Sequence, residues 1–223
     1  MTESAKEIVK MITGMAGQYS PYEIFSDWVR CCALAISNSV DPFHGKIWED
    51  RERQYMETIR RYREPDQIAF SNMLVLLADS LEKEMSDTLG EIFMDKGMGS
   101  SSQVGQFFTP FNLSELAARM MFADSIPSIP EEMTELNEPS CGSGGMIIAM
   151  AKVMKKHGIN YQTQMKVVAQ DLDWRCVYMC YTQISLLGIN GIVVQGDTLG
   201  KPYSYKTEID HILLTPKAMG VLL

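Results

Sequence analysis

A glycine-rich stretch at residues 138–145, Glu-Pro-Ser-Cys-Gly-Ser-Gly-Gly, constrains this chain more than any other part of it. An apolar segment with an acidic end, residues 133–138, leads into the stretch, and apolar residues at helical spacing follow over 146–154. Glycine allows a sharp turn and lets a ligand approach bare main chain. This order therefore predicts a strand, a glycine turn and a helix, with a ligand site at the turn.

The residues around this turn restrict the kind of ligand. A helix N-terminus offers free N–H groups and a positive dipole end, which suits a nucleotide-like ligand at the carboxyl end of a parallel strand. The spacing matches neither the dinucleotide fingerprint nor a phosphate loop. An acid directly before the turn, Glu138, favours a cationic or hydroxyl-bearing ligand such as S-adenosylmethionine, which has an ammonium, a sulfonium and a ribose. A plain tight turn between strand and helix is the competing interpretation.

The composition allows one medium-sized domain, or such a domain with a helical appendage, because 46% of the 223 residues are hydrophobic. The formal net charge of −8 argues against a freestanding nucleic-acid binder. The arginines that do cluster, over residues 51–63, alternate with acids, so we interpret that segment as a solvated helix face.

Cysteine usage and apolar runs bear on metals and on the cellular compartment. The five cysteines lack zinc-ligand spacing, so we interpret them as buried thiols and expect no metal site. We find neither a signal-peptide pattern nor an apolar run of membrane length, and we expect a cytoplasmic protein without membrane contact.

Two regions are expected from the spacing of apolar residues. Residues 1–96 repeat them at helical spacing and predict a helical region, in which Ser20 caps a helix that begins at Pro21. The Gly/Ser-rich segment 97–105 is the predicted boundary, and a second domain is expected over residues 105–223.

A segment that reads Gly-Gln-Phe-Phe-Thr-Pro, residues 105–110, leads into another predicted helix. Phe107 and Phe108, followed by Thr109 and Pro110, are compatible with a small-molecule pocket or with a hydrophobic staple at the helix start, and taken alone they favour the staple. The predicted buried stripe of this helix consists of Leu113, Leu116, Ala117, Met120 and Met121.

Three further strands are predicted after the glycine turn, at residues 166–170, 192–195 and 209–214. Asp171 ends the first of these, where Rossmann-like sheets bind a ribose diol, whereas Asp173 is expected to cap the helix over 174–187. Asp197 follows the next strand and would accept a hydrogen bond from an adenine amino group, or would serve as an ordinary turn residue.

Taken together, these motifs resemble the adenine-N6 DNA methyltransferases, most of all the modification subunits of type I restriction systems. The resemblance covers about residues 85–216 and includes the segment 87–93, Asp-Thr-Leu-Gly-Glu-Ile-Phe. It implies a Rossmann-like S-adenosylmethionine-dependent methyltransferase sheet, truncated to about four parallel strands, as a partial cofactor-binding domain over residues 105–223. The implied cofactor-binding residues are Phe107, Phe108, Thr109, Pro110, Glu138, Pro139, Cys141, Gly142, Ser143, Gly144, Asp171, Asp197 and Thr198.

The catalytic motif of that family, Asn-Pro-Pro followed by Phe or Tyr, is degenerate in this chain. The matching residues are Thr215-Pro216-Lys217-Ala218, so Thr215 and Pro216 stand at the catalytic positions. A hydroxyl lacks the reach of the amide, and Ala218 offers no face on which a flipped adenine could stack. We therefore expect methyl transfer to be weak or absent in this chain alone.

The shortened sheet bears on partners. An apolar fourth strand at the edge would expose unpaired N–H and C=O groups, so we expect a second copy or a partner subunit to cover it, and DNA contact only within a larger complex. Two alternatives stay open: an active adenine methylase completed by a partner chain, and a non-enzymatic interaction module with a vestigial cofactor site.

Overall fold

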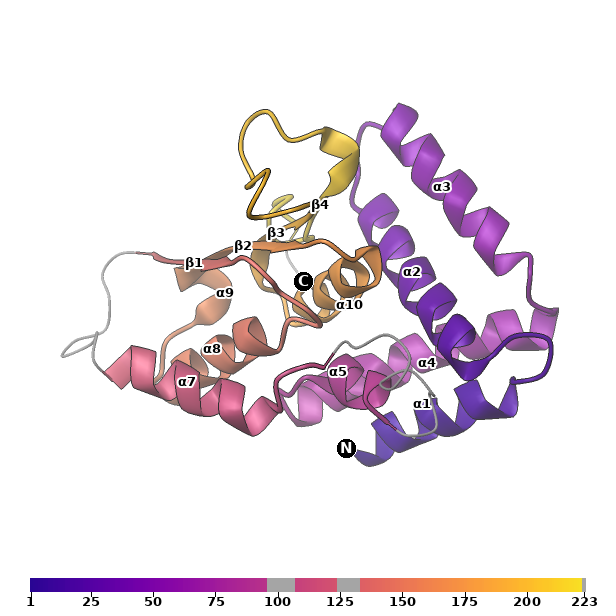
Figure 1. Cartoon of the computed structure of the whole chain (residues 1–223), viewed down its shortest axis with the longest axis horizontal. Coiled ribbons are helices and arrows are strands. Elements are labelled where there is room, and N and C mark those ends of the chain that lie inside the picture. Colours follow the sequence, from indigo (N-terminus) through magenta and orange to yellow (C-terminus); the bar gives the residue numbers. More distant parts are fainter. Residues whose placement is uncertain (96–106, 124–132, 222–223) are drawn as a thin grey trace.

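The computed structural model describes residues 1–95, 107–123 and 133–221. A group of helices from the N-terminal half packs beside a four-stranded sheet, and helices α8 and α10 lie against one face of that sheet (Figure 1). The N-terminal helices are α1 (Glu3–Gly14), α2 (Pro21–Ser39), α3 (Lys46–Ile59), α4 (Glu64–Lys83) and α5 (Thr88–Phe93). The remaining elements are α7 (Phe111–Ala123), β1 (Thr134–Glu138), α8 (Gly145–Lys156), α9 (Tyr161–Gln164), β2 (Met165–Asp171), α10 (Trp174–Leu186), β3 (Asn190–Gln195), η2 (Ile209–His211) and β4 (Ile212–Leu214).

The sheet has the strand order β1-β2-β3-β4. The first three strands are parallel, with Leu136 opposite Val167 and Val168 opposite Ile192. The α/β fold class predicted from the sequence is confirmed, but β4 runs antiparallel to β3, so the expectation of a fourth parallel strand is wrong. A parallel connection needs a crossover, usually a helix, whereas the chain from Gly196 to Glu208 is built of turns and returns directly beside β3.

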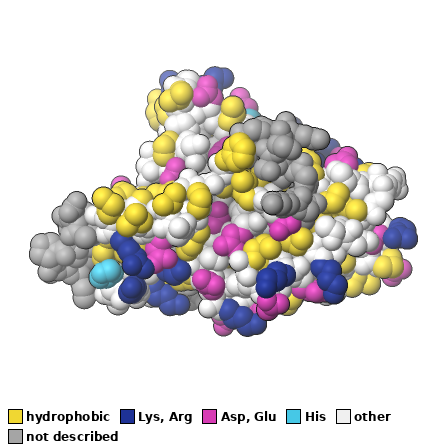
Figure 2. Space-filling view, turned by 60° about the horizontal axis from the view of Figure 1, so that its bottom comes forward, with side chains coloured by type: hydrophobic (Ala, Val, Ile, Leu, Met, Phe, Trp, Pro, Cys, Tyr) yellow, Lys and Arg dark blue, Asp and Glu magenta, His cyan; other side chains and the backbone are white. Residues whose placement is uncertain are grey.

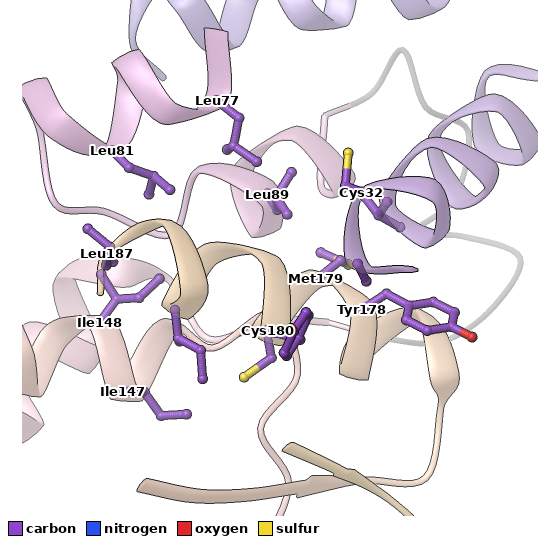
Figure 3. Close-up of a cluster of buried hydrophobic side chains, with 14 of the residues drawn as sticks. Cys32, Leu77, Leu81, Leu89, Ile147, Ile148, Tyr178, Met179, Cys180 and Leu187 are labelled. Carbon is purple, nitrogen blue, oxygen red and sulfur yellow. The ribbon is translucent and has the colours of Figure 1, made fainter. Parts of the chain in front are cut away.

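A single cluster of buried apolar side chains joins the helical region to the sheet. Figure 3 shows part of it, where Leu77 of α4 and Leu89 of α5 lie near Met179 of α10, and Leu81 of α4 lies on the side of Leu187. The predicted boundary segment lies outside the described residues, and the division into two domains stays a prediction. The core itself is continuous between the two regions.

Several local predictions are confirmed. Ser20 accepts a hydrogen bond from the Glu23 amide in a capping box at the start of α2, and Asp173 caps α10 through the Arg175 amide. All five cysteines are buried free thiols.

The interpretation of the charged residues within 51–63 as a solvated face is wrong for Arg51. The Arg51 side chain is only 14% exposed; it donates a hydrogen bond to the Ile212 carbonyl at 3.1 Å and lies 3.8 Å from the Asp41 carboxylate. Charge alternation along the sequence does not reveal this contact, because Ile212 is 161 residues away. Arg51 therefore connects α3 to the start of β4.

The predicted buried stripe of α7 is also largely wrong. Four of its five members, Leu113, Leu116, Met120 and Met121, are more than half exposed. The buried positions are instead Ser114, Ala118 and Phe122, one residue further along the helix at i, i+4 and i+8. Helix α7 lies at the lower left of Figure 1. The space-filling view in Figure 2 shows hydrophobic side chains on the surface at the left of the molecule.

None of the helices that the structure describes combines the length and the apolar character needed to span a lipid bilayer.

Candidate functional site

A cavity of about 410 Å³ lies between the glycine turn after β1, the segment before α7 and the N-terminal end of α5. Seven of the thirteen cofactor-binding residues predicted from the sequence line it: Phe107, Phe108, Thr109, Cys141, Gly142, Ser143 and Asp171. Six further residues that line it were not among the predicted ligands: Asp87, Ser114, Ser140, Gly145, Met146 and Cys176. The motifs read from distant parts of the sequence thus meet at one place.

The glycine turn has the backbone conformation that its composition predicts. Gly142 and Gly144 have φ values of 51° and 97°, in the left-handed region that side chains disfavour. The Gly144 amide closes the turn on the Cys141 carbonyl at 2.8 Å, and Gly144 caps the N-terminus of α8. A Cβ on Gly142 would lie 3.1 Å from the Phe108 ring, so glycine lets the ring close over the turn.

Asp171, at the end of β2, is tied to this turn. Its Oδ2 accepts a hydrogen bond from the Gly142 amide at 2.9 Å, and its Oδ1 accepts one from the Asp173 amide at 3.0 Å. A carboxylate has about four acceptor positions, so two stay available, and Asp171 lines the cavity. Asp171 is therefore placed to bind hydroxyl groups of a ligand.

Asp87, the N-cap of α5, is the centre of a buried network that the sequence did not reveal as part of the site. Its Oδ1 accepts hydrogen bonds from Gln183 Nε2 and from the Gly90 amide, both at 2.9 Å. Its Oδ2 accepts a short hydrogen bond from the Ser143 hydroxyl. Gln183 Nε2 also donates to the Ser143 carbonyl at 2.8 Å, so α5, α10 and the glycine turn are joined at one carboxylate.

Ser114, in the first turn of α7, is a second residue that sequence reasoning missed. It is 1% exposed, and its hydroxyl has no hydrogen-bond partner among the residues that the structure describes. A buried hydroxyl without a partner is costly, and the residue to which this one belongs lines the cavity. Read from the sequence, Ser114 looks like an ordinary polar position on an amphipathic helix.

The cavity is acidic. Among its described lining residues, two are aspartates and none is a lysine, arginine or histidine. Glu138 lies beside it, and burial raises the pKa of Glu138; the Ser140 amide opposes this shift and the nearby charge of Asp171 adds to it. A hydrogen bond with Cys180, followed by burial, raises the pKa of Cys141 well above its usual value, so its thiol stays protonated. Such a cavity favours a ligand that carries positive charge and hydroxyl groups.

The other six predicted ligands, Pro110, Glu138, Pro139, Gly144, Asp197 and Thr198, are not among the residues that line the cavity. The Thr198 hydroxyl donates to the Pro139 carbonyl at 2.6 Å, which fixes the loop after β3 to the glycine turn. Asp197 is exposed and accepts a hydrogen bond from the Leu199 amide at 3.0 Å, as a turn residue does. Of the two interpretations of Asp197 given above, its contacts in this structure are those of a turn residue.

Thr215 and Pro216, which stand at the degenerate catalytic positions, are both buried, and neither is among the residues that line the cavity. The Thr215 hydroxyl donates to the Ile189 carbonyl at 2.8 Å and accepts from the Gly191 amide at 3.0 Å. These contacts hold the end of β4 against β3.

A sheet of three parallel strands and one antiparallel strand, whose first strand ends in a glycine turn over an acidic cavity, defines an α/β protein of the nucleotide-cofactor-binding class. The family model for N-6 DNA methylases matches residues 84–217, which is more than half of the chain, and the chain belongs to this family.

Among curated proteins, the chain is similar to the type I restriction enzyme MpnII methylase subunit of Mycoplasma pneumoniae. The two are 23% identical over 188 residues, which is 79% of this chain and 33% of that protein. The chain thus spans about one third of the length of this relative.

Two solved structures were compared. A Listeria monocytogenes protein described as a class I S-adenosylmethionine-dependent methyltransferase has a TM-score of 0.52 at 12% identity, over 90% of this chain and 55% of that chain. This likeness concerns the fold alone. A type I restriction-modification methyltransferase subunit from Streptococcus thermophilus has a TM-score of 0.48 at 10% identity, over 92% of this chain and 59% of that chain.

Proposed function

We propose that this protein binds S-adenosylmethionine in the cavity over the glycine turn, as a DNA adenine-N6 methyltransferase-like protein of the restriction-modification type. The observation that carries the proposal is the acidic cavity itself, where the glycine turn, Phe108 and Asp171 meet. Membership of the N-6 DNA methylase family and the similarity to the methylase subunit of Mycoplasma pneumoniae support the same conclusion.

The residues present fit such a cofactor. The ring of Phe108 packs directly over the bare backbone of Gly142 at one side of the cavity, and Asp171 has free acceptor positions for a ribose diol. The absence of Lys, Arg and His from the described lining suits a sulfonium. The bound cofactor would supply an electrophilic methyl group.

We further propose that methyl transfer by this chain alone is weak or absent. A target adenine must leave the duplex and stack on an aromatic face while its amino group is held by polar acceptors. The positions that would do this carry Thr215 and Ala218, and Thr215 is occupied by backbone contacts within the sheet. Base–aromatic stacking is worth about 1–3 kcal/mol, so losing it together with the amide predicts a large drop in rate.

An active methylase completed by a partner chain is the second candidate. Strand β1 pairs on one side only, with β2, and β4 pairs only with β3 among the described strands, so both edges of the sheet offer backbone groups to another chain. The relative from Mycoplasma pneumoniae is named as a subunit and is three times as long as the matched region. A second copy or a partner subunit would then supply the missing catalytic groups, and DNA would be bound only by the assembly.

Isothermal titration calorimetry with S-adenosylmethionine and S-adenosylhomocysteine tests the binding proposal. We expect both to bind to the wild type, and Gly142→Ala to weaken binding at least tenfold, because its Cβ displaces Phe108. Gly158→Ala is the matched control: Gly158 also has a positive φ, 77°, but a Cβ there meets nothing within 4 Å. Absence of binding to the wild type would remove the proposal, and equal loss in the two variants would remove the role of Phe108.

Transfer of a labelled methyl group to adenine-containing DNA separates the two candidates. The first predicts weak or absent transfer that does not rise when host extract is added, whereas the second predicts that transfer rises once a partner chain is present.

A further inference from the structure

A second cavity, of about 460 Å³, lies where the helical region meets α10 and β4. Helices α2 and α3 supply one side of it, α10 another, and η2 with β4 the third; Figure 1 shows α2 and α3 beside α10 and the end of the sheet at β4. None of its lining residues lines the cavity over the glycine turn, and none has a part in the proposed function. Its volume lies within the range of about 300–1,000 Å³ that is typical of small-molecule sites.

The second cavity is cationic, whereas the first is acidic. Arg30 of α2 and Arg51 of α3 line it, together with His211. Asp210 is the one acid among its described lining residues, and it is exposed, as is Glu208 beside His211. In a chain with a net charge of −8, two arginines in one cavity favour an anionic ligand there.

The two guanidinium groups are only partly satisfied by the protein. Arg30 donates from Nη2 to the neutral Gln54 amide oxygen at 2.8 Å, and its Nε is buried without a partner among the described residues. The ion pairs between described residues do not include Arg30. Arg51 has a carboxylate, that of Asp41, only at 3.8 Å; burial lowers the pKa of Arg51, and nearby groups only partly offset this. A bound anion would supply the missing negative charge.

Tyr178 of α10 shows that the two arginines converge. Burial raises the pKa of Tyr178, and the charge of Arg30, a hydrogen bond from Arg30 and the charge of Arg51 oppose this rise. Both guanidinium groups therefore lie near the Tyr178 hydroxyl, although they come from different helices. Their two positive charges match the charge of about −1.5 to −2 on a phosphate monoester at pH 7, whereas a carboxylate would match only one of them.

An aromatic wall lies beside these arginines. The rings of Trp174 and Tyr178 stack with their centroids 5.2 Å apart, and the His211 ring packs against Trp174 at 5.9 Å. His211 Nδ1 donates to Gln195 Oε1 at 2.7 Å, which holds the imidazole in place. Aromatic side chains bind flat rings, and stacking of this kind tolerates any nucleobase. Arginines beside such a wall favour a ligand that joins a flat ring to a phosphate.

We propose that the second cavity binds a phosphorylated nucleoside, with Arg30 and Arg51 contacting the phosphate and Trp174 forming the wall against the base. A free mononucleotide and the end of a nucleic-acid strand present this same chemistry. The site is independent of the cofactor cavity, because the two share no lining residue.

Isothermal titration calorimetry with thymidine 5′-monophosphate, thymidine and inorganic phosphate tests the site. A pyrimidine nucleotide is the probe because an adenosine would also be a candidate for the cavity over the glycine turn. We expect the wild type to bind the monophosphate at least tenfold more tightly than either fragment, since hydrogen bonds to a charged group and base stacking each have effects of this order.

Variants locate the binding. Arg30→Gln should weaken the monophosphate tenfold or more and change thymidine less than about twofold, because it removes only a phosphate contact. Trp174→Leu should weaken both by about fivefold or more, because it removes the wall. Arg53→Gln is the matched control: Arg53 also lies on α3, its side chain is 58% exposed, and it does not line the second cavity, so binding should not change.

The outcomes separate this proposal from the proposed function. Gly142→Ala, which alters the first cavity, should leave binding of the monophosphate unchanged. The proposal is refuted if the monophosphate does not bind at millimolar concentration, if either fragment binds as tightly, or if Arg30→Gln has no more effect than Arg53→Gln. Circular dichroism verifies folding; if Trp174→Leu does not fold, the comparison of the two arginine variants decides.

A single-stranded oligothymidylate with a 5′ phosphate identifies the source of the ligand. Binding at least tenfold tighter than that of the mononucleotide, and lost in Arg30→Gln, assigns the cavity to the end of a strand. Equal or weaker binding assigns it to a free nucleotide. Both results support the phosphorylated nucleoside as the ligand.

Discussion

At the scale of single residues, Asp87 is the most unusual group in the protein. It is a buried carboxylate that closes a network between α5, α10 and the glycine turn. Burial raises its pKa above the usual value, and the hydrogen bonds from Ser143, Gln183 and Gly90 only partly offset that rise. The folded protein therefore holds the Asp87 proton more tightly than the unfolded chain does.

This shift predicts the pH dependence of stability. Between the usual pKa of an aspartate and the higher pKa in the folded state, the folded protein binds more protons than the unfolded chain, so the free energy of unfolding falls as pH rises. Asp87→Asn removes the titrating group. Urea denaturation from pH 3.5 to 7 should show that the wild type loses stability relative to this variant as pH rises.

Asp197→Asn, which alters an exposed carboxylate, serves as the control for general charge effects and should follow the wild type. A difference between wild type and Asp87→Asn that is flat, or that grows in favour of the wild type with rising pH, would contradict the account.

The sequence predicts the residues of the site that lie in one local motif, but not those that arrive by packing. Gly142 and Asp171 are recognisable because a glycine turn and a strand end have local signatures. Asp87 meets Ser143 across 56 positions, and Ser114 is distinguished only by the burial of its hydroxyl. No local sequence signal marks either contact, although the segment 87–93, which contains Asp87, resembles the corresponding segment of the family.

At the scale of elements, α7 shows the limit of hydrophobic periodicity. Its large apolar residues predict one buried face, but the structure buries the neighbouring face of Ser114, Ala118 and Phe122. Small residues let α7 approach α8 closely, and this gain in contact is invisible to a pattern that counts only apolar side chains. The prediction that β4 is parallel was wrong for a similar reason. The spacing of apolar residues predicts a strand but does not specify in which direction it runs beside its neighbour.

Two lysine substitutions on α7 distinguish these faces. Met120→Lys should change the free energy of unfolding by no more than about 0.5 kcal/mol, because Met120 is 63% exposed. Ala118→Lys places a charge at a position that is 1% exposed and should destabilise the protein by about 3 kcal/mol or more. Urea denaturation of both variants measures this contrast, and a larger loss from Met120→Lys would restore the face predicted from the sequence.

At the scale of the whole molecule, the continuous core predicts that the helical region and the sheet unfold together. Buried thiols report on both parts: Cys31 and Cys32 lie in α2, and Cys176 and Cys180 lie in α10. In a urea series, thiol labelling followed by mass spectrometry should give one midpoint for all four. Labelling of the α2 pair at clearly lower urea would show instead that the two regions are separate folding units.

The two edges of the sheet differ in what another chain would reach there. The edge strand β1, opposite β4, ends directly at the glycine turn. A chain that added a strand there would bring its own side chains to the mouth of the cavity. Binding of the added chain would then change which ligands the cavity accepts, because its side chains would lie beside the ligand, and no helix would have to move.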